Sequence, residues 1–306
     1  MSRLPVLDLA RYRAGAVAET IAEADSACRD LGFLLVAGHQ VDTGLISEMR
    51  AVSAAFFDQP ADYKLRFRMP GTSRGFVPFG TESLAATSGT GAEPDLKQAF
   101  AVGPAELVGA SGVPVAWPDQ PREFASVWRR YHAALRELAD CVLTVLTAAL
   151  GLPAGAVAGQ MSQAASFLRV IDYPASQPDQ RTQGLRAGAH TDFGALTVLS
   201  SDGGGLQVCT PEGNWLDVPV VPGTFVVNIG DVMAIWSGHR WRSTPHRVSR
   251  GAARRQTVVF FHNPGLDAVV EPMVGAANTG SPSSVDAVPT FADWLRAKSH
   301  RQRSAT

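Results

Sequence analysis

Three residues whose side chains bind metal ions well are His190, Asp192 and His246, which lie in the strings GAHTDFGALTVL and STPHRV. Two imidazoles and one carboxylate suit a borderline divalent metal, and three protein ligands leave half of an octahedron open. Such a ligand set is typical of non-haem Fe(II) centres, where dioxygen and a second ligand take the open positions. The pattern therefore predicts a metal centre, with iron as the favoured ion.

The spacing of the first two ligands has a geometric reason. Side chains at positions i and i+2 of a strand point to the same face, so a strand over 188–199, continuing into the apolar stretch 195–199, would let His190 and Asp192 converge on one ion. His246 lies 54 residues after Asp192. A sheet that folds back on itself must bring it close.

A second pair of residues indicates how a carboxylate could be held beside the metal. Arg255 and Thr257 also stand at i and i+2, at the start of an expected strand over 256–261. A guanidinium and a hydroxyl on one face can bind a carboxylate through charge-assisted hydrogen bonds. The combination predicts a site for an oxidisable acid next to the metal.

Further motifs surround these residues in a fixed order. Before the metal motif stand LPVLDL, DLGFLLVAGHQV, FFDQPADYK, SRGFVPFGTES, DLKQAFAVG and LRVIDYP. The HTD string is followed by GGLQV, GDVMAIWSG, STPHRV and RQTVVFFHNP. In this order, over about residues 4–265, the chain resembles the isopenicillin N synthase-like branch of the Fe(II)/2-oxoglutarate-dependent dioxygenases.

The resemblance implies a role for each of these residues. His190, Asp192 and His246 would be the catalytic iron ligands, and Arg255, Thr257 and Tyr173 would bind 2-oxoglutarate. The family usually has Ser where this chain has Thr257, which keeps the hydroxyl and adds a methyl group. The implied reaction uses O2 and oxidises a small organic substrate, with release of succinate and CO2. Hydroxylation is the expected outcome, desaturation or cyclisation are the other forms, and ascorbate is an expected stimulant.

Four other residues are candidates for contacting the substrate. Arg169 lies four residues before Tyr173 on one expected strand, where it would either meet a substrate acid or join a structural ion pair. Arg74 and Phe76 lie in a segment that often borders the pocket in the family. His239 precedes the second histidine ligand in a loop that could face the substrate.

The residues alone leave three alternatives open. An oxidase of the same fold that does not use 2-oxoglutarate would place the substrate's own carboxylate on Arg255 and Thr257. A degenerate β scaffold could be a binding module without catalysis. A zinc hydrolase could use the same three ligands, although zinc commonly prefers a closed tetrahedral site, and Arg255 would then have no purpose.

The periodicity of the chain predicts a mixed α and β fold. Helices are expected at 16–31, 43–57 and 122–150, and short strands at 166–171, 195–200, 205–209, 224–229, 232–236 and 256–262. Such strands favour a double-stranded β-helix, or jelly roll, with flanking N-terminal helices and one long helix supporting the sheet. We expect an N-terminal helical and β region at 1–120, the catalytic core at 121–270, and a C-terminal extension with a short helix at 271–306.

Composition excludes several other classes of protein. The 306 residues are 45% hydrophobic with a formal net charge of −1, which gives no case for nucleic-acid binding. Residues 141–168 carry no charge, but the glycine and proline at 151–153 favour a buried helix over a membrane span.

The expected setting is the cytoplasm. Three widely separated cysteines do not suggest a disulfide framework, and the first residues lack an apolar signal-peptide core. Only three of the 27 basic residues are lysine, a skew typical of GC-rich coding. We therefore expect a bacterial source and a role in specialised metabolism, with a small-molecule substrate and no prediction of oligomeric state.

Overall fold

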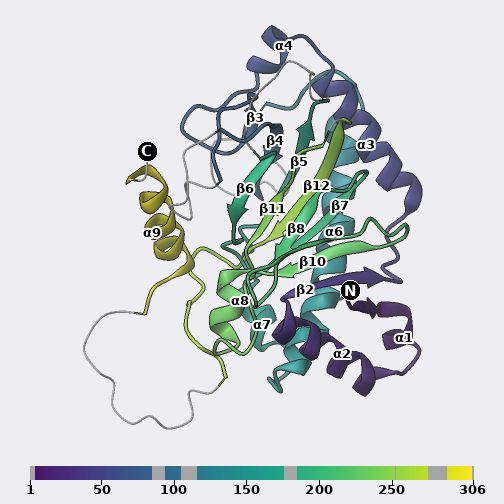
Figure 1. Ribbon diagram of the computed structural model, residues 1–306, viewed down its shortest axis with the longest axis vertical. Coiled ribbons are helices and arrows are strands. Elements are labelled where there is room, and N and C mark those ends of the chain that lie inside the picture. Colours follow the sequence, from purple (N-terminus) through teal and green to yellow (C-terminus); the bar gives the residue numbers. More distant parts are fainter. Residues whose placement is uncertain are drawn as a thin grey trace.

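The computed structural model describes residues 4–84, 94–104, 116–175, 185–251, 253–274 and 288–304. Two β-sheets form its centre (Figure 1). The order of the described strands in the major sheet is β1 (Val6–Asp8), β2 (Phe33–Ala37), β10 (Phe225–Ile229), β7 (Leu196–Ser201), β12 (Arg255–His262), β5 (Phe167–Tyr173), β4 (Gln98–Val102) and β3 (Gly75–Val77). In the minor sheet the order is β6 (Ala187–His190), β11 (His246–Val248), β8 (Leu206–Cys209) and β9 (Trp215–Asp217). The predicted mixed α and β jelly roll is confirmed.

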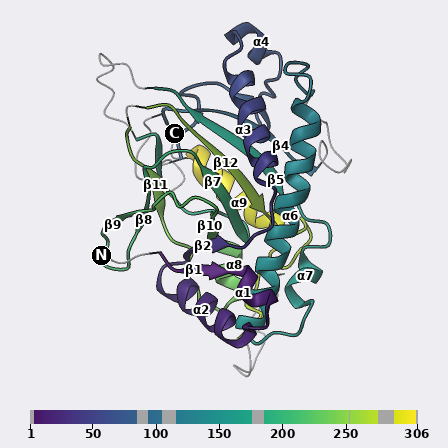
Figure 2. The same cartoon turned by 90° about the vertical axis from the view of Figure 1, so that its right-hand side faces the viewer.

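The long helix α6 (Phe124–Ala149) supports one face of the major sheet and contacts β12 and β7 (Figure 2). Its buried side chains recur at helical spacing, and they include Trp128, Tyr131, Leu135, Leu138, Val142 and Val145. Helices α2 (Val17–Asp30) and α3 (Thr43–Phe57) pack against α6. This layer buries the outer face of the sheet, so the predicted helices at 16–31, 43–57 and 122–150 are confirmed.

The remaining described helices are short or lie at the periphery. They are α1 (Leu9–Arg13), α4 (Ala61–Leu65), α7 (Ala156–Gln160), α8 (Asp231–Trp236) and α9 (Phe291–Ser304). Within the described ranges, none of the helices combines the length and the apolarity that a membrane-spanning segment needs.

Strands from the N-terminal third lie at both edges of the major sheet. β2 pairs with β10 and carries β1 on its far side, while β4 pairs with β5 and carries β3. The middle of the same sheet is formed by β10, β7, β12 and β5, which all follow residue 160. The N-terminal and C-terminal parts of the chain therefore share one hydrogen-bonded sheet.

Two predicted elements were wrong. Residues 232–236 form helix α8 instead of a strand, because the buried Val232, Met233 and Trp236 fit helical spacing, and a short apolar run is ambiguous between the two structures. The single strand expected over 188–199 is divided into β6 and β7. Asp192 lies in the connection just beyond the end of β6, so it is not a strand residue.

Candidate active site

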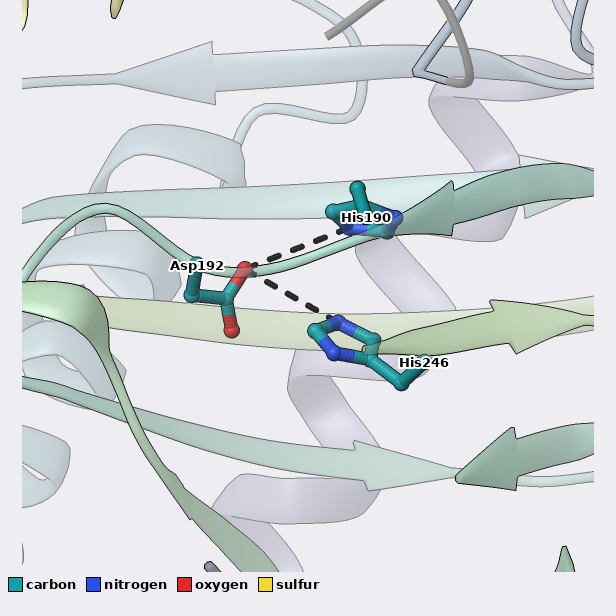
Figure 3. A group of neighbouring side chains, drawn as sticks. All are labelled: His190, Asp192 and His246. Carbon is teal, nitrogen blue, oxygen red and sulfur yellow. Dashed lines mark ion pairs between the residues drawn. The ribbon is translucent and has the colours of Figure 1, made fainter. Parts of the chain in front are cut away.

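His190, Asp192 and His246 come together as the sequence predicts. Their potential ligand atoms all lie within 4.8 Å of one another. Oδ1 of Asp192 is 4.0 Å from Nε2 of His190 and 3.8 Å from Nε2 of His246 (Figure 3). His190 ends β6 and pairs directly with His246, the first residue of β11. The backbone ladder thus places both imidazoles, and the short connection after β6 adds the carboxylate.

Hydrogen bonds on the far side of each histidine leave one nitrogen free for a metal. Nδ1 of His190 lies 2.8 Å from the carbonyl oxygen of Gly188, and Nδ1 of His246 lies 3.2 Å from that of Thr244. A carbonyl only accepts, so each Nδ1 carries the proton and each Nε2 presents a lone pair. This orientation is usual for histidines that bind metals through Nε2.

The carboxylate of Asp192 is held in a similar way. Its Oδ2 accepts hydrogen bonds from Oγ1 of Thr197 at 2.6 Å and from Nδ2 of Asn228 at 2.7 Å. Asp192 is buried, and it keeps Oδ1 on the side of the two histidines. One oxygen is therefore fixed by the protein, while the other can bind an ion.

The electrostatics of the group agree with a divalent ligand set. Burial and the neighbouring His246 lower the pKa of His190 to about 3, so this imidazole is neutral at neutral pH. For Asp192, burial works against ionisation, but the two histidines and the hydrogen bonds from Asn228 and Thr197 hold its pKa below the ordinary value. A charged carboxylate beside the neutral imidazole of His190 suits a divalent cation.

A cavity of about 310 Å³ extends from this group along the inner faces of β5 and β12. Arg255, Thr257 and Tyr173 line it together with the three potential metal ligands. Tyr173 pairs with Arg255 across the two strands. The guanidinium carbon of Arg255 lies 5.0 Å from the centre of the Tyr173 ring. The predicted acid-binding residues and the predicted metal ligands thus share one chamber.

Arg255, one of the residues that line this chamber, has an unused donor. Its Nε donates to Oγ of Ser201 at 2.8 Å and to the carbonyl oxygen of Gly203 at 3.0 Å, whereas its buried Nη1 has no hydrogen-bond partner in the described part of the chain. Thr257 donates to Ser201 at 3.3 Å. A buried guanidinium with a free N–H is a suitable seat for the distal carboxylate of a dicarboxylic acid. The residues present therefore fit 2-oxoglutarate.

Of the four residues expected near a substrate, only Arg169 lines the cavity. Phe76 is buried in the aromatic core, with its ring centre 5.9 Å from that of Phe56. Arg74 is not a lining residue, although its neighbour Ser73 is. His239 is exposed at the end of α8. Phe76 and His239 thus lie away from this cavity, in the Phe56 cluster and beyond the end of α8, and Arg74 is not among its lining residues.

Sequence reasoning did not single out the residues that support the site. Thr197 and Asn228 hold Asp192, and Ser201 links Arg255 to Thr257. Lys97 lines the cavity and lies 3.7 Å from Glu82. A signal existed for Asn228, because it is a polar residue within the otherwise apolar strand β10, where a buried polar group needs a partner.

Two protein-family models match the chain. The model of the 2OG-Fe(II) oxygenase superfamily matches residues 164–264, and the model of the N-terminal part of non-haem dioxygenases in morphine synthesis matches residues 4–120. The first range contains every predicted ligand of iron and all three predicted contacts of 2-oxoglutarate.

Similar proteins agree with the family models. A homoarginine-6-hydroxylase of Oryza sativa subsp. japonica is 33% identical over 268 residues, which cover 81% of this chain and 79% of that protein. The validamycin A dioxygenase of Streptomyces hygroscopicus subsp. limoneus is 32% identical over 303 residues, which cover 91% and 81%. A crystal structure of a full-length Neurospora crassa protein in complex with alpha-KG (2-oxoglutarate) has a TM-score of 0.84 at 25% identity, over 97% of this chain and 96% of that one. Sequence, fold and site geometry agree that this chain belongs to the Fe(II)- and 2-oxoglutarate-dependent dioxygenases.

Proposed function

We propose that His190, Asp192 and His246 bind Fe(II), and that Arg255, Thr257 and Tyr173 bind 2-oxoglutarate in the same cavity. The observation that carries this proposal is the buried, unpartnered Nη1 of Arg255, a residue that lines the same chamber as the His–Asp–His group. An unpaired buried donor costs stability, and a bound carboxylate removes that cost.

The charges of the chamber favour a dianionic cosubstrate. Within the described ranges Nε of Arg255 donates only to a hydroxyl and a carbonyl. These hydrogen bonds leave the positive charge of the guanidinium without a carboxylate partner at Nε. The three ligands carry one negative charge, from Asp192. A divalent cation and one arginine together with Asp192 leave two positive charges, which the two carboxylates of 2-oxoglutarate balance.

The bound iron and 2-oxoglutarate supply the oxidising chemistry, with succinate and CO2 as products. The protein itself positions the reactants and excludes water. Ser201 orients Arg255, Thr197 and Asn228 orient Asp192, and apolar side chains line much of the remaining cavity. We propose hydroxylation of a small organic molecule, with desaturation or cyclisation as outcomes that depend on how the substrate carbon is held.

Relatives support a small-molecule substrate and differ in its nature. They are named after homoarginine, validamycin A and naringenin, and crystal structures of the Neurospora crassa relative contain thymine or 5-formyluracil. We propose a cytoplasmic location, which suits ferrous iron and the three free cysteines. A role in bacterial specialised metabolism stays a prediction.

The proposed function is tested by succinate release from Fe(II)-loaded protein, with and without 2-oxoglutarate. Asp192→Ala should abolish succinate release and iron binding while the melting temperature stays close to that of the parent. Asp217→Ala, at an exposed residue of β9, is the matched control and should retain both. Succinate release by the Asp192→Ala protein would count against Asp192 as a ligand.

The cosubstrate site needs its own variant. Arg255→Ala should raise the KM for 2-oxoglutarate by about 10- to 100-fold, because a hydrogen bond to a charged group is worth roughly 1.5–3 kcal/mol. An unchanged KM would move the distal carboxylate away from Arg255. Oxygen uptake that does not depend on 2-oxoglutarate would instead identify an oxidase that binds the substrate acid there.

A further inference from the structure

A cluster of four charged residues lies beside the cavity, apart from the proposed iron and 2-oxoglutarate contacts. Nζ of Lys97 is 2.8 Å from Oδ2 of Asp95 and 3.7 Å from Oε2 of Glu82, and Nη2 of Arg169 donates to the same oxygen of Glu82. All four side chains are largely buried. Lys97 and Arg169 line the cavity, whereas Asp95 and Glu82 do not.

The position of Arg169 separates it from the cosubstrate end of the cavity. It lies on the same face of β5 as Tyr173 but four residues before it, or roughly 13 Å along the strand. In the register of the sheet Tyr173 pairs with Arg255, whereas Arg169 pairs with Val259. The distal carboxylate of 2-oxoglutarate on Arg255 therefore leaves Arg169 for another molecule.

The charge of Arg169 is already balanced. Two positive side chains, Lys97 and Arg169, are matched by two negative ones, Glu82 and Asp95. An entering carboxylate would meet a neutral cluster and would have to give up its hydration without gaining a free countercharge, which is costly in a buried site. The sequence left a substrate acid or an ion pair as alternatives for Arg169, and the ion pair with Glu82 is what the structure shows.

One donor of this cluster is nevertheless unused. Nε of Arg169 is buried and has no hydrogen-bond partner in the described part of the chain. A neutral carbonyl or amide oxygen satisfies such an N–H without adding charge. The nearby lining is apolar and includes Phe167, Ile171, Phe193, Val259, Phe261 and Leu295.

We propose that Arg169 is a specificity-determining residue that binds a neutral carbonyl oxygen of the substrate, and that Glu82 makes the site reject carboxylates. The substrate class is then a small, uncharged, largely apolar molecule that carries a carbonyl or amide group. This inference rests on the proposed function, since it assumes that Arg255 is occupied by 2-oxoglutarate.

The test compares matched compounds on the anaerobic Fe(II)–2-oxoglutarate holoprotein by isothermal titration calorimetry. Each of several apolar scaffolds, such as 3-phenylpropyl, is offered as a primary amide, a carboxylate and an amine. The amides should bind at least tenfold more tightly than the matched carboxylates and amines. Tighter binding of the carboxylates or the amines, or no binding of any amide, would overturn the proposal.

Two variants make the test specific. Arg169→Met should weaken the binding of the amides about 10- to 100-fold. The control is Arg130→Met, which removes an exposed arginine from its pair with Glu48 and should leave the affinity for the amides unchanged. Glu82→Gln removes the negative charge that pairs with Arg169. The affinity for the carboxylates should therefore rise at least tenfold, while the affinity for the amides should change less than threefold. A Glu82→Gln protein with the parent's preference would overturn the role of Glu82, even if Arg169→Met failed to fold.

A separate titration distinguishes failure of this inference from failure of the proposed function. Binding of 2-oxoglutarate alone to the Fe(II) protein reports on the proposed iron and 2-oxoglutarate contacts and does not depend on the amide site at Arg169. If 2-oxoglutarate binds and the amide preference is absent, the neutral-carbonyl site is wrong and the proposed function stands. If 2-oxoglutarate does not bind, the proposed function is wrong, and the inference that rests on it falls as well.

Discussion

His190 and His246 are directly paired residues of two antiparallel strands, with ring centres 4.3 Å apart. Their positions are therefore set by the hydrogen bonds between β6 and β11 more than by the freedom of their side chains. The ladder shifts register between His246 and Val248, so the pairing is regular at the ligand and irregular just after it. Asp192 has no such ladder, and its geometry depends on the side chains that hold Oδ2.

Thr197→Val tests that dependence. The variant removes the 2.6 Å hydrogen bond to Asp192 and leaves only Asn228 on Oδ2. Partners that orient a ligand typically contribute about 10- to 100-fold in metal affinity, so Fe(II) should bind more weakly by about that factor. Anaerobic metal titration measures the change. Thr144→Val on the exposed side of α6 is the control, and equal affinities in all three proteins would contradict the role of Thr197.

Thr257 separates the contribution of its hydroxyl from that of its methyl group. Thr257→Ser keeps the hydroxyl that faces Ser201 and should change the KM for 2-oxoglutarate less than threefold. Thr257→Val removes the hydroxyl at nearly constant volume and should raise this KM by about tenfold, the effect of one lost hydrogen bond. Steady-state succinate assays at varied 2-oxoglutarate give both values. A larger effect of Thr257→Ser than of Thr257→Val would show that the methyl group, not the hydroxyl, matters.

Gly230 is placed where no larger residue fits. A Cβ at this position would lie 2.2 Å from the carbonyl oxygen of Gly194 and 3.2 Å from that of Asp192. Gly230→Ala should therefore push the Asp192 connection away, with a loss of about 1–3 kcal/mol in unfolding free energy and weaker binding of Fe(II). Urea denaturation and metal titration measure the two effects. Gly159→Ala, with open space around its Cβ, should show neither.

His132 predicts a pH dependence of stability that does not involve the metal. Burial, together with Arg136 and His262, lowers the pKa of His132 to about 4 in the folded protein. The unfolded chain, with a pKa near 6.5, binds the proton more readily. The stabilising contribution of the neutral imidazole is therefore complete above about pH 6.5, and it is lost as the pH falls toward 4.

The matched variant isolates this contribution. Between pH 7.5 and pH 5 the parent should lose about 2 kcal/mol of unfolding free energy that His132→Gln does not lose. Urea denaturation of both proteins at the two pH values measures the difference. Parallel loss in the two proteins would show that His132 is protonated in the fold.

The cluster of His190, Asp192 and His246 could be predicted from the sequence because residue type and local spacing carry most of the information. The His-x-Asp spacing together with a distant histidine is a specific pattern. For the long helices, the regular spacing of the apolar residues clearly predicts a helix instead of a strand. The same reasoning failed for 232–236, where five residues are too few to distinguish a strand from a helix. It also placed Asp192 on a strand, whereas the chain leaves β6 at His190.

The supporting residues could not be predicted, because their partners are distant in the chain. Asn228 is 36 residues from Asp192, and Glu82 is 87 residues from Arg169. Only the register of the folded sheets brings such pairs together. Phe76 was expected at the pocket because it lies in a segment that often borders the pocket in the family. Its ring instead packs in the aromatic core.

The placement of N-terminal strands on either side of the major sheet has a practical consequence for anyone who wishes to trim this enzyme. A fragment that begins at residue 121 would retain every proposed iron and 2-oxoglutarate contact. It would also leave β10 and β5 with bare backbone amides and carbonyls where β2 and β4 now bond. Exposed edge strands pair with strands of other molecules, so the fragment should aggregate and should not be an active minimal enzyme.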